Sequence, residues 1–316
     1  MPPARRPGRA DLQHANAHRR REGRRLTETG GPTGPTVRRR TLGTALTELR
    51  EAAGLQQKDS AGALSCSASK ISRIEQGKGL IKAMELRALL DLYGVTDEST
   101  RAGLLELARR AAETGWWEQA EYEAIMPAGL GVYVGLESDA RTVRAWELGW
   151  VCGLLQHEDY AAAILAGGRP MPPETVRRLL EVRGRRQSRL LAESDPLELW
   201  AIMDESVLMR PIGDSAVMAK QIKHLQIMAE RPNVTVQILP RTKGMNPGLR
   251  GSFTILEFAP NESPIIYVES PAGNTFLERD HQIRNFRHDY HHLTAGAMDP
   301  QETIDRLREA AKEYGS

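Results

Sequence analysis

The sequence predicts a multidomain protein, in which an all-α helix-turn-helix domain is followed by an α+β domain with a small central sheet. Three observations predict this. Residues 41–95 form short amphipathic segments separated by glycines, residues 197–269 contain apolar and alternating runs, and residues 1–40 are rich in Arg but almost free of large apolar side chains. We expect a disordered tail at 1–40, the helix-turn-helix domain at 41–112 and the α+β domain at 113–316.

The N-terminal tail concentrates positive charge. Residues 1–40 hold 11 Arg and 3 acidic residues, a net charge of +8, so in a chain of net charge +2 the remaining residues carry −6. A segment of this composition cannot bury enough apolar surface to offset its chain entropy, which predicts disorder. Two interpretations stay open: a basic arm that adds phosphate contacts to DNA, and an extension without function.

Helical periodicity organises residues 41–112. Apolar side chains recur at i, i+3, i+4 and i+7 from Leu42, and Gly54 ends this first helix. A second helix is expected over residues 57–64, and two further apolar stripes end at Gly94 and run from about Glu98 to Ala112. Five short helices with glycine stops are typical of a compact helix-turn-helix domain.

The third predicted helix carries the candidate site. Ser67 can cap its N-terminus, Ile71 and Ile74 share one face, and Gly77 follows where a left-handed cap is needed. The opposite face is small, polar and basic, which suits insertion into the major groove of double-stranded DNA. The candidate DNA-binding residues on this helix are Ser67, Ala68, Ser69, Lys70, Ser72 and Arg73.

The same stretch resembles the lambda-repressor-like (XRE-type) family of DNA-binding domains. The matching residues are Gly54-Leu55-x-Gln57, Ala61, Leu64, Ser67 and Ile71-Ser72-Arg73-Ile74-Glu75-x-Gly77. The resemblance implies that Gln57, at the start of the second helix, contacts phosphate or a base. Ser60 stands where the family usually has a buried Leu, so we expect a looser core, and Ser65 replaces the turn Gly, where it must accept or avoid a positive φ.

The remainder of the chain alternates helices and strands. Helices are expected over 136–166 and 174–192, and the many arginines of the second are interpreted as a solvated face. From Leu197 onward we expect strands at 197–202, 234–239, 252–258 and 265–269, with helices at 214–230, 280–297 and 300–314.

Several short sequence motifs of this region resemble a C-terminal domain of unknown function found in many actinobacterial regulators. They include Trp116-Trp117, Gly153-Leu154-Leu155-Gln156, Arg231-Pro232-Asn233-Val234 and Gly251-x-Phe253-Thr254-Ile255-Leu256-Glu257-Phe258. The resemblance implies an antitoxin-like transcriptional regulator, commonly encoded beside a small acidic partner protein. Cys152 and His157 differ from the residues that the family usually has in its sequence motif around Gly153.

Signals for catalysis, cofactors and metals are weak. No nucleophile elbow, P-loop or H-E-x-x-H motif occurs, and no cofactor is expected. His288, His291 and His292 could hold a metal on one helical face, with Asp280 and His281 nearby, but a polar helix is favoured. Cys66 and Cys152 are interpreted as buried thiols in a reducing cytoplasm, and no apolar run is long enough to cross a membrane.

Together these features predict a cytoplasmic, sequence-specific DNA-binding transcriptional regulator rather than an enzyme. Its α+β domain is expected to form a homodimer and to sense a partner protein or a ligand that the sequence does not identify. The first alternative is an antitoxin-like interaction module that neutralises a small partner protein. The second is a metal- or nucleotide-dependent enzyme with an attached DNA-binding domain.

Overall fold

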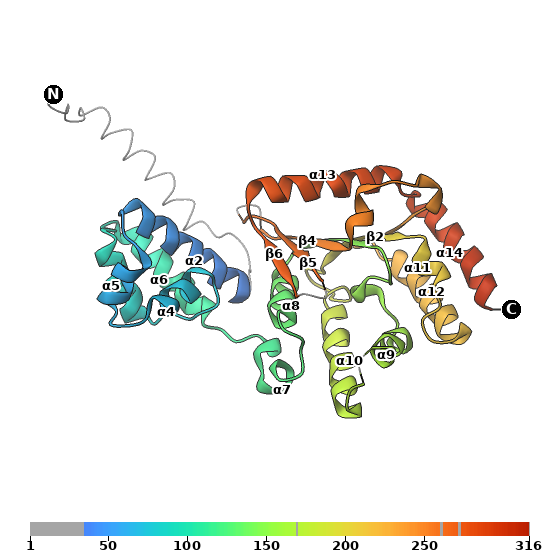
Figure 1. Cartoon of the computed structure of the whole chain (residues 1–316), viewed down its shortest axis with the longest axis horizontal. Coiled ribbons are helices and arrows are strands. Elements are labelled where there is room, and N and C mark those ends of the chain that lie inside the picture. Colours follow the sequence, from blue (N-terminus) through green and yellow to red (C-terminus); the bar gives the residue numbers. More distant parts are fainter. Residues whose placement is uncertain (1–34, 169, 260–261, 271–272, 316) are drawn as a thin grey trace, which may run out of the picture. The chain divides into compact units, whose positions relative to one another are not determined.

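A computed structural model describes residues 35–168, 170–259, 262–270 and 273–315 (Figure 1). Two compact units divide the chain between Thr114 and Gly115, and Ala259 belongs to the first. The predicted disorder of residues 1–34 falls outside the described residues. Within the part of the chain that the structure describes, no helix combines the length and apolar character that crossing a bilayer requires.

The first unit is a bundle of five helices around one apolar core. They are α2 (Pro35–Ala52), α3 (Gln57–Ala63), α4 (Ala68–Glu75), α5 (Ala83–Leu92) and α6 (Glu98–Ala111). The periodic apolar residues of the sequence point inward: Leu46, Leu86, Leu90 and Leu104 are at most 1% exposed. The turn glycines Gly54, Gly77 and Gly94 all have positive φ, as helix ends of this kind require. The predicted all-α domain is confirmed.

The first helix begins earlier than the sequence analysis placed it. Residues 35–40, assigned to the disordered tail, form the start of α2. Val37 is 4% exposed and Thr36 8%, so this turn contributes to the core although its neighbours are three consecutive arginines. The Arg run hid a single buried apolar position, which is too weak a signal for helical periodicity.

Two serines that depart from the family pattern are accommodated differently. Ser65 has a φ of 49°, so it accepts the left-handed conformation of the turn. Ser60 is fully buried, but its hydroxyl shares a 2.8 Å hydrogen bond with the Tyr93 hydroxyl. The Tyr93 hydroxyl is the partner that a buried serine needs, so Ser60 places no unsatisfied hydroxyl in the core.

The second unit contains one six-stranded mixed sheet, which confirms the predicted α+β class. The strands are β1 (Thr142–Glu147), β2 (Glu198–Asp204), β3 (Val234–Leu239), β4 (Phe253–Glu257), β5 (Ile265–Val268) and β6 (Thr275–Leu277). Their order is β3-β2-β1-β4-β5-β6. The first three are parallel, and β4, β5 and β6 pair antiparallel, so the sheet changes character at β1.

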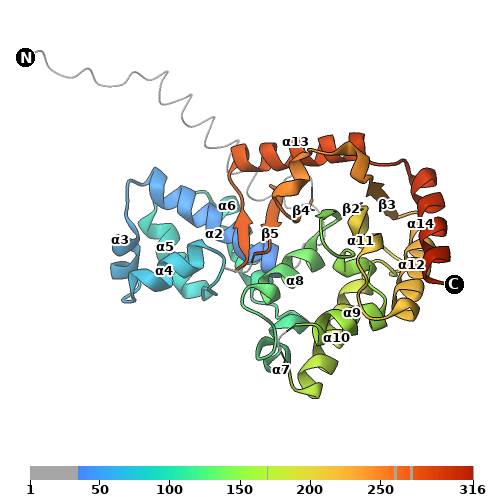
Figure 2. The same ribbon diagram turned by 45° about the vertical axis from the view of Figure 1, so that its right-hand side comes forward.

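Helices lie on both sides of this sheet (Figures 1 and 2). The longer ones are α8 (Leu130–Asp139), α9 (Glu158–Ala166), α10 (Pro173–Gln187), α12 (Ser215–Ala229), α13 (Asp280–Gly296) and α14 (Pro300–Tyr314). The short ones are η1 (Trp116–Glu118), α7 (Ala120–Glu123), η2 (Gly153–Leu155), α11 (Ser206–Met209), η3 (Arg241–Lys243) and η4 (Pro247–Arg250). Apolar residues of α13 pack against Trp146 of β1, whereas Tyr133 of α8 packs against Tyr267 on the other face.

The central strand β1 corrects the sequence analysis. Residues 142–147 were expected to be helical, but they pair with both β2 and β4. Val143 and Trp146 satisfy a helical spacing, yet both are at most 1% exposed because the strand is covered on both faces. A short apolar run of this kind cannot be assigned from periodicity alone. Strand β6 was also missed, and the strands predicted at 197–202, 234–239, 252–258 and 265–269 are confirmed.

The arginines of α10 are not all solvated, which corrects a second expectation. Arg186 makes two hydrogen bonds to the Glu137 carboxylate of α8, at 2.7 and 2.9 Å. The two side chains are only 12% and 3% exposed. Burial lowers the pKa of Arg186, but the charge of Glu137 and the hydrogen bonds raise it to a net value above that of free arginine. One face of α10 is therefore part of the interior, and the exposed pairs such as Arg177–Glu174 lie on the other.

Candidate nucleic-acid interface

Helix α4 has the geometry that the sequence predicted. The Ser67 hydroxyl accepts a hydrogen bond from the Lys70 amide at 3.3 Å and caps the helix. Ile71 and Ile74 are 1% and 3% exposed and anchor the helix to the core. Gly77, with a φ of 68°, ends it. The helix is thus fixed by its apolar back, which leaves its front free to face a ligand.

The outward-facing residues fall into two groups. Ser67, Ala68, Ser69 and Arg73 are exposed, and Lys70, Ser72 and Gln57 are partly buried. Among the described residues, Arg73 has no ion-pair partner, so its guanidinium is available to phosphate or to a base edge. The short side chains beside it allow the helix backbone to approach a groove closely.

Lys70 already has a partner. Its Nζ lies 2.5 Å from the Glu85 carboxylate in the first turn of α5, and the lysine side chain is 40% exposed. The hydrogen bond raises the pKa of Lys70 and lowers the pKa of Glu85. To contact a phosphate, Lys70 must share its protons with Glu85 or leave it. Glu85 was not among the site residues predicted from the sequence.

A buried ionic network holds Gln57 in place. Arg50 of α2 contacts both Glu75 carboxylate oxygens, at 2.6 and 3.1 Å, and donates to the Leu55 carbonyl at 2.9 Å. The Gln57 amide donates to the same Glu75 carboxylate at 2.7 Å. The Arg50 and Glu75 side chains are 9% and 6% exposed. Helices α2, α3 and α4 are therefore joined at one point, directly behind the proposed DNA-facing surface.

The network of Arg50, Gln57 and Glu75 could not be predicted from the sequence. Arg50 and Glu75 are 25 positions apart, and neither lies in a charge pattern that predicts a pair. The helices can approach because Gly43 has no side chain: a Cβ there would collide with the carbonyl oxygens of Ile74 and Glu75. Only the folded bundle brings these groups together.

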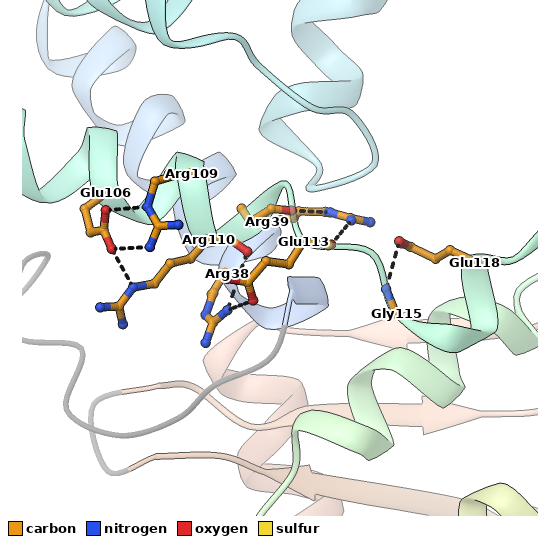
Figure 3. Close-up of polar contacts among 9 residues, drawn as sticks. Arg38, Arg39, Glu106, Arg109, Arg110, Glu113, Gly115 and Glu118 are labelled. Atoms are coloured by element: carbon orange, nitrogen blue, oxygen red, sulfur yellow. Dashed lines mark hydrogen bonds and ion pairs between the residues drawn. The ribbon is translucent and has the colours of Figure 1, made fainter.

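Arg38 and Arg39 belong to the bundle and not to a free arm. The Arg38 guanidinium pairs with Glu113 at 2.8 Å, and Arg39 donates to the carbonyl oxygens of Ala111 and Glu113 at 2.7 and 2.9 Å (Figure 3). These carbonyls lie at and just beyond the C-terminal end of α6, where backbone acceptors lack helical partners. The two arginines therefore stabilise a helix end and tie α2 to α6.

The other candidate clusters are less organised. His288 and His292 lie one turn apart on α13, with ring nitrogens 3.1 Å from each other. In the described ranges, no group of three or more His, Cys, Asp or Glu side chains is arranged to hold a metal ion. Cys152 is buried, and Cys66 is partly exposed, which differs from the expectation that both are buried.

Comparisons with known families agree with this division. Residues 41–104 match the model of a helix-turn-helix domain, which supports a DNA-binding regulator. Residues 130–309 match the model of a domain of unknown function (DUF5753), which covers more than half of the chain. No curated protein and no solved structure matches the chain. The chain belongs to the family that this domain of unknown function defines, with a helix-turn-helix domain preceding it.

Proposed function

We propose that the chain is a sequence-specific transcriptional regulator that reads double-stranded DNA with the front of α4. The observation that carries this proposal is the contrast between the two faces of the helix. Ile71 and Ile74 are buried, whereas Arg73 is exposed and has no ion-pair partner in the described part of the chain. The residues proposed to contact DNA are Gln57, Ser67, Ala68, Ser69, Lys70, Ser72 and Arg73. Gln57 and Lys70 are held by Glu75 and Glu85, so these carboxylates orient the interface.

Arg73→Ala is expected to weaken specific DNA binding by about 1–3 kcal/mol without changing thermal unfolding, since the side chain has no described partner. The operator is obtained by selecting bound duplexes from a randomised pool, and affinity is then measured by gel shift. Arg109→Ala is the matched control, because that exposed arginine of α6 pairs with Glu106, three positions earlier on the same helix. Operator affinity equal to that of the unchanged protein would refute the assignment.

The α+β domain is proposed to form a homodimer and to sense a ligand or partner. A single helix-turn-helix domain reads few base pairs, and two must lie about 34–36 Å apart to read successive major-groove faces. Most apolar residues of the helical bundle pack in its own core, and it exposes three large ones, Leu80, Met84 and Leu92. We therefore assign most of the dimer contact to the α+β domain. A bound molecule that favours one arrangement of the subunits would change DNA affinity.

Sedimentation of two fragments checks this role. Residues 115–316 are expected to be dimeric alone, and residues 35–114 are expected to be monomeric and to bind the operator far more weakly than the intact chain. A monomeric C-terminal fragment together with a dimeric N-terminal fragment would contradict the proposal that the α+β domain forms the dimer.

One surface supports the alternative role of binding an acidic partner protein, as in the antitoxin-like subfamily. The loops and short helices that follow the adjacent parallel strands β1, β2 and β3 expose four large apolar side chains, Trp150, Met209, Met245 and Leu249. The same loops carry exposed basic residues at positions 210, 241, 243 and 250. Two copies meeting through this surface would bring like charges together, whereas an acidic protein would complement it.

A further inference from the structure

Two partly buried side chains of opposite charge lack ion-pair partners in the second unit. Glu147 ends β1 and Arg183 lies in α10, and within the described ranges neither lies within ion-pair distance of an opposite charge. Burial raises the pKa of Glu147 to about 7, partly opposed by a Ser252 hydrogen bond and further raised by the charge of Glu269. Burial lowers the pKa of Arg183 to about 10, and the nearby charge of Arg186 adds to this. Both charges are therefore held at a cost in free energy.

Glu147 faces the side of the sheet on which α10, the helix of Arg183, lies. Trp146 packs toward α13, so its neighbour Glu147 faces the side of α8 and α10. Strands β1 and β5 both run antiparallel to β4, so their carboxyl ends lie at the same end of the sheet. Tyr267 and Glu269 are two positions apart at the end of β5 and therefore lie on one face of the sheet. The Tyr267 ring lies 4.2 Å from the Tyr133 ring of α8.

Helix α10 contributes the positively charged residues of this cluster, Arg183 and Arg186. The Arg186 guanidinium lies 5.2 Å from the Tyr133 ring, and Arg183 is one turn before it on the same helix. The charge of Glu269 acts on both Arg183 and Glu147, so Glu269 lies near each of them. Glu269 is exposed, so the cluster opens to solvent at that end.

Arg183 is oriented but mostly unsatisfied. Its Nη1 donates to the side-chain oxygen of Gln156, which is the single hydrogen bond that it makes with described residues. Gln156 is 4% exposed and is fixed by its own bond to the Val151 carbonyl at 2.6 Å. A guanidinium has five N–H donors, so Arg183 presents a preorganised fork of the type that binds carboxylate or phosphate.

A purely structural explanation fits poorly. On the same helix, Arg186 pairs with Glu137, which shows how this fold stabilises a buried guanidinium. Glu147 and Arg183 would stabilise the unit in the same way if they met, yet they remain apart. Charges kept shielded and unpaired are typical of a binding site, where the ligand supplies the missing partners.

We infer that Glu147, Gln156, Arg183, Tyr267 and Glu269 form a site for a small zwitterion. Its acidic group, carboxylate or phosphate, contacts Arg183, and its amine contacts Glu147, with Glu269 at the mouth. The site lies at the carboxyl end of β1, where the strand order reverses between β1-β2-β3 on one side and β4-β5-β6 on the other, and open sheets commonly bind ligands at such a point. This inference rests on the sensing role proposed above.

The test uses the intact chain. Thermal unfolding is followed by Trp fluorescence with free α-amino acids and phosphoethanolamine, each at about 5 mM. Ethylamine and inorganic phosphate are tested separately as the two halves of the ligand. At least one zwitterion is expected to raise the unfolding midpoint more than either half does. Calorimetric titration should then show binding that is weaker by about tenfold or more in Arg183→Gln and in Glu147→Gln.

The variants separate binding from folding. Glu147→Gln should unfold at a higher temperature than the unchanged chain without ligand, because it removes a desolvated carboxylate, and yet bind the zwitterion less tightly. Arg177→Gln, an exposed arginine of the same helix, should bind normally. No midpoint shift with any zwitterion, equal shifts with phosphate alone, or unchanged binding by both variants would each overturn the inference. Operator binding measured on the same proteins tests the DNA-reading role independently.

Discussion

Glu75→Ala is expected to lower the free energy of unfolding of the helical unit by about 3–5 kcal/mol. The substitution leaves the Arg50 guanidinium, whose side chain is 9% exposed, without its two carboxylate contacts. It also removes the acceptor of the Gln57 amide. Stability and operator affinity should therefore fall together, although Glu75 itself is not proposed to touch DNA.

The chain offers a means of following each unit separately. All five Trp residues lie at position 116 or beyond, so Trp fluorescence reports the α+β unit, whereas far-ultraviolet circular dichroism reports both units. Glu75→Ala should introduce an early dichroism transition and leave the fluorescence transition unchanged. Glu51→Ala is the control, because Glu51 is 67% exposed and only 3.5 Å from Arg50 at its closest. If Glu75→Ala unfolds like the control, the network does not stabilise the bundle.

The helical bundle could be predicted from sequence because its signals are local. Ser67, Ile71, Ile74 and Gly77 each have a role that nearby residues define, and the structure places each in that role. What could not be predicted were the partners of charged side chains. Glu85 binds Lys70 across 15 positions, a distance over which sequence spacing says nothing about contact.

In the α+β unit, the central strand could not be predicted from the sequence. Strands β2, β3, β4 and β5 alternate or run apolar between Pro and Gly residues, and all four were predicted, whereas the edge strand β6 was not. Strand β1 is covered on both faces, so Val143, Ala145 and Trp146 are all buried and the period of two disappears. The position of β1 between β2 and β4 depends on pairs such as Val143 with Leu199 and with Leu256, which the sequence separates by more than 50 residues.

The interior charges of the second unit were hidden for a related reason. A helix rich in Arg is usually solvated, and the exposed pairs of α10 follow that rule. Arg183 and Arg186 differ because they contact other parts of the unit: Arg183 binds Gln156, which follows η2, and Arg186 pairs with Glu137 of α8. No residue type in α10 distinguishes the two faces, so the proposed zwitterion site became visible only with the fold.

Glu137→Ala is expected to destabilise the α+β unit by about 3–5 kcal/mol, because it leaves Arg186 buried beside the Tyr133 ring without a counter-charge. Trp fluorescence should report the earlier transition directly. Glu174→Ala is the control, since that carboxylate, 57% exposed, forms ion pairs on the solvated side of α10. The double variant Glu137→Leu with Arg186→Met should recover much of the loss, because removing both charges leaves nothing unpaired. Unfolding of Glu137→Ala at the same midpoint as the control would mean that this pair does not hold α8 to α10, and Arg183 would then lack the rigid support that the proposed site requires.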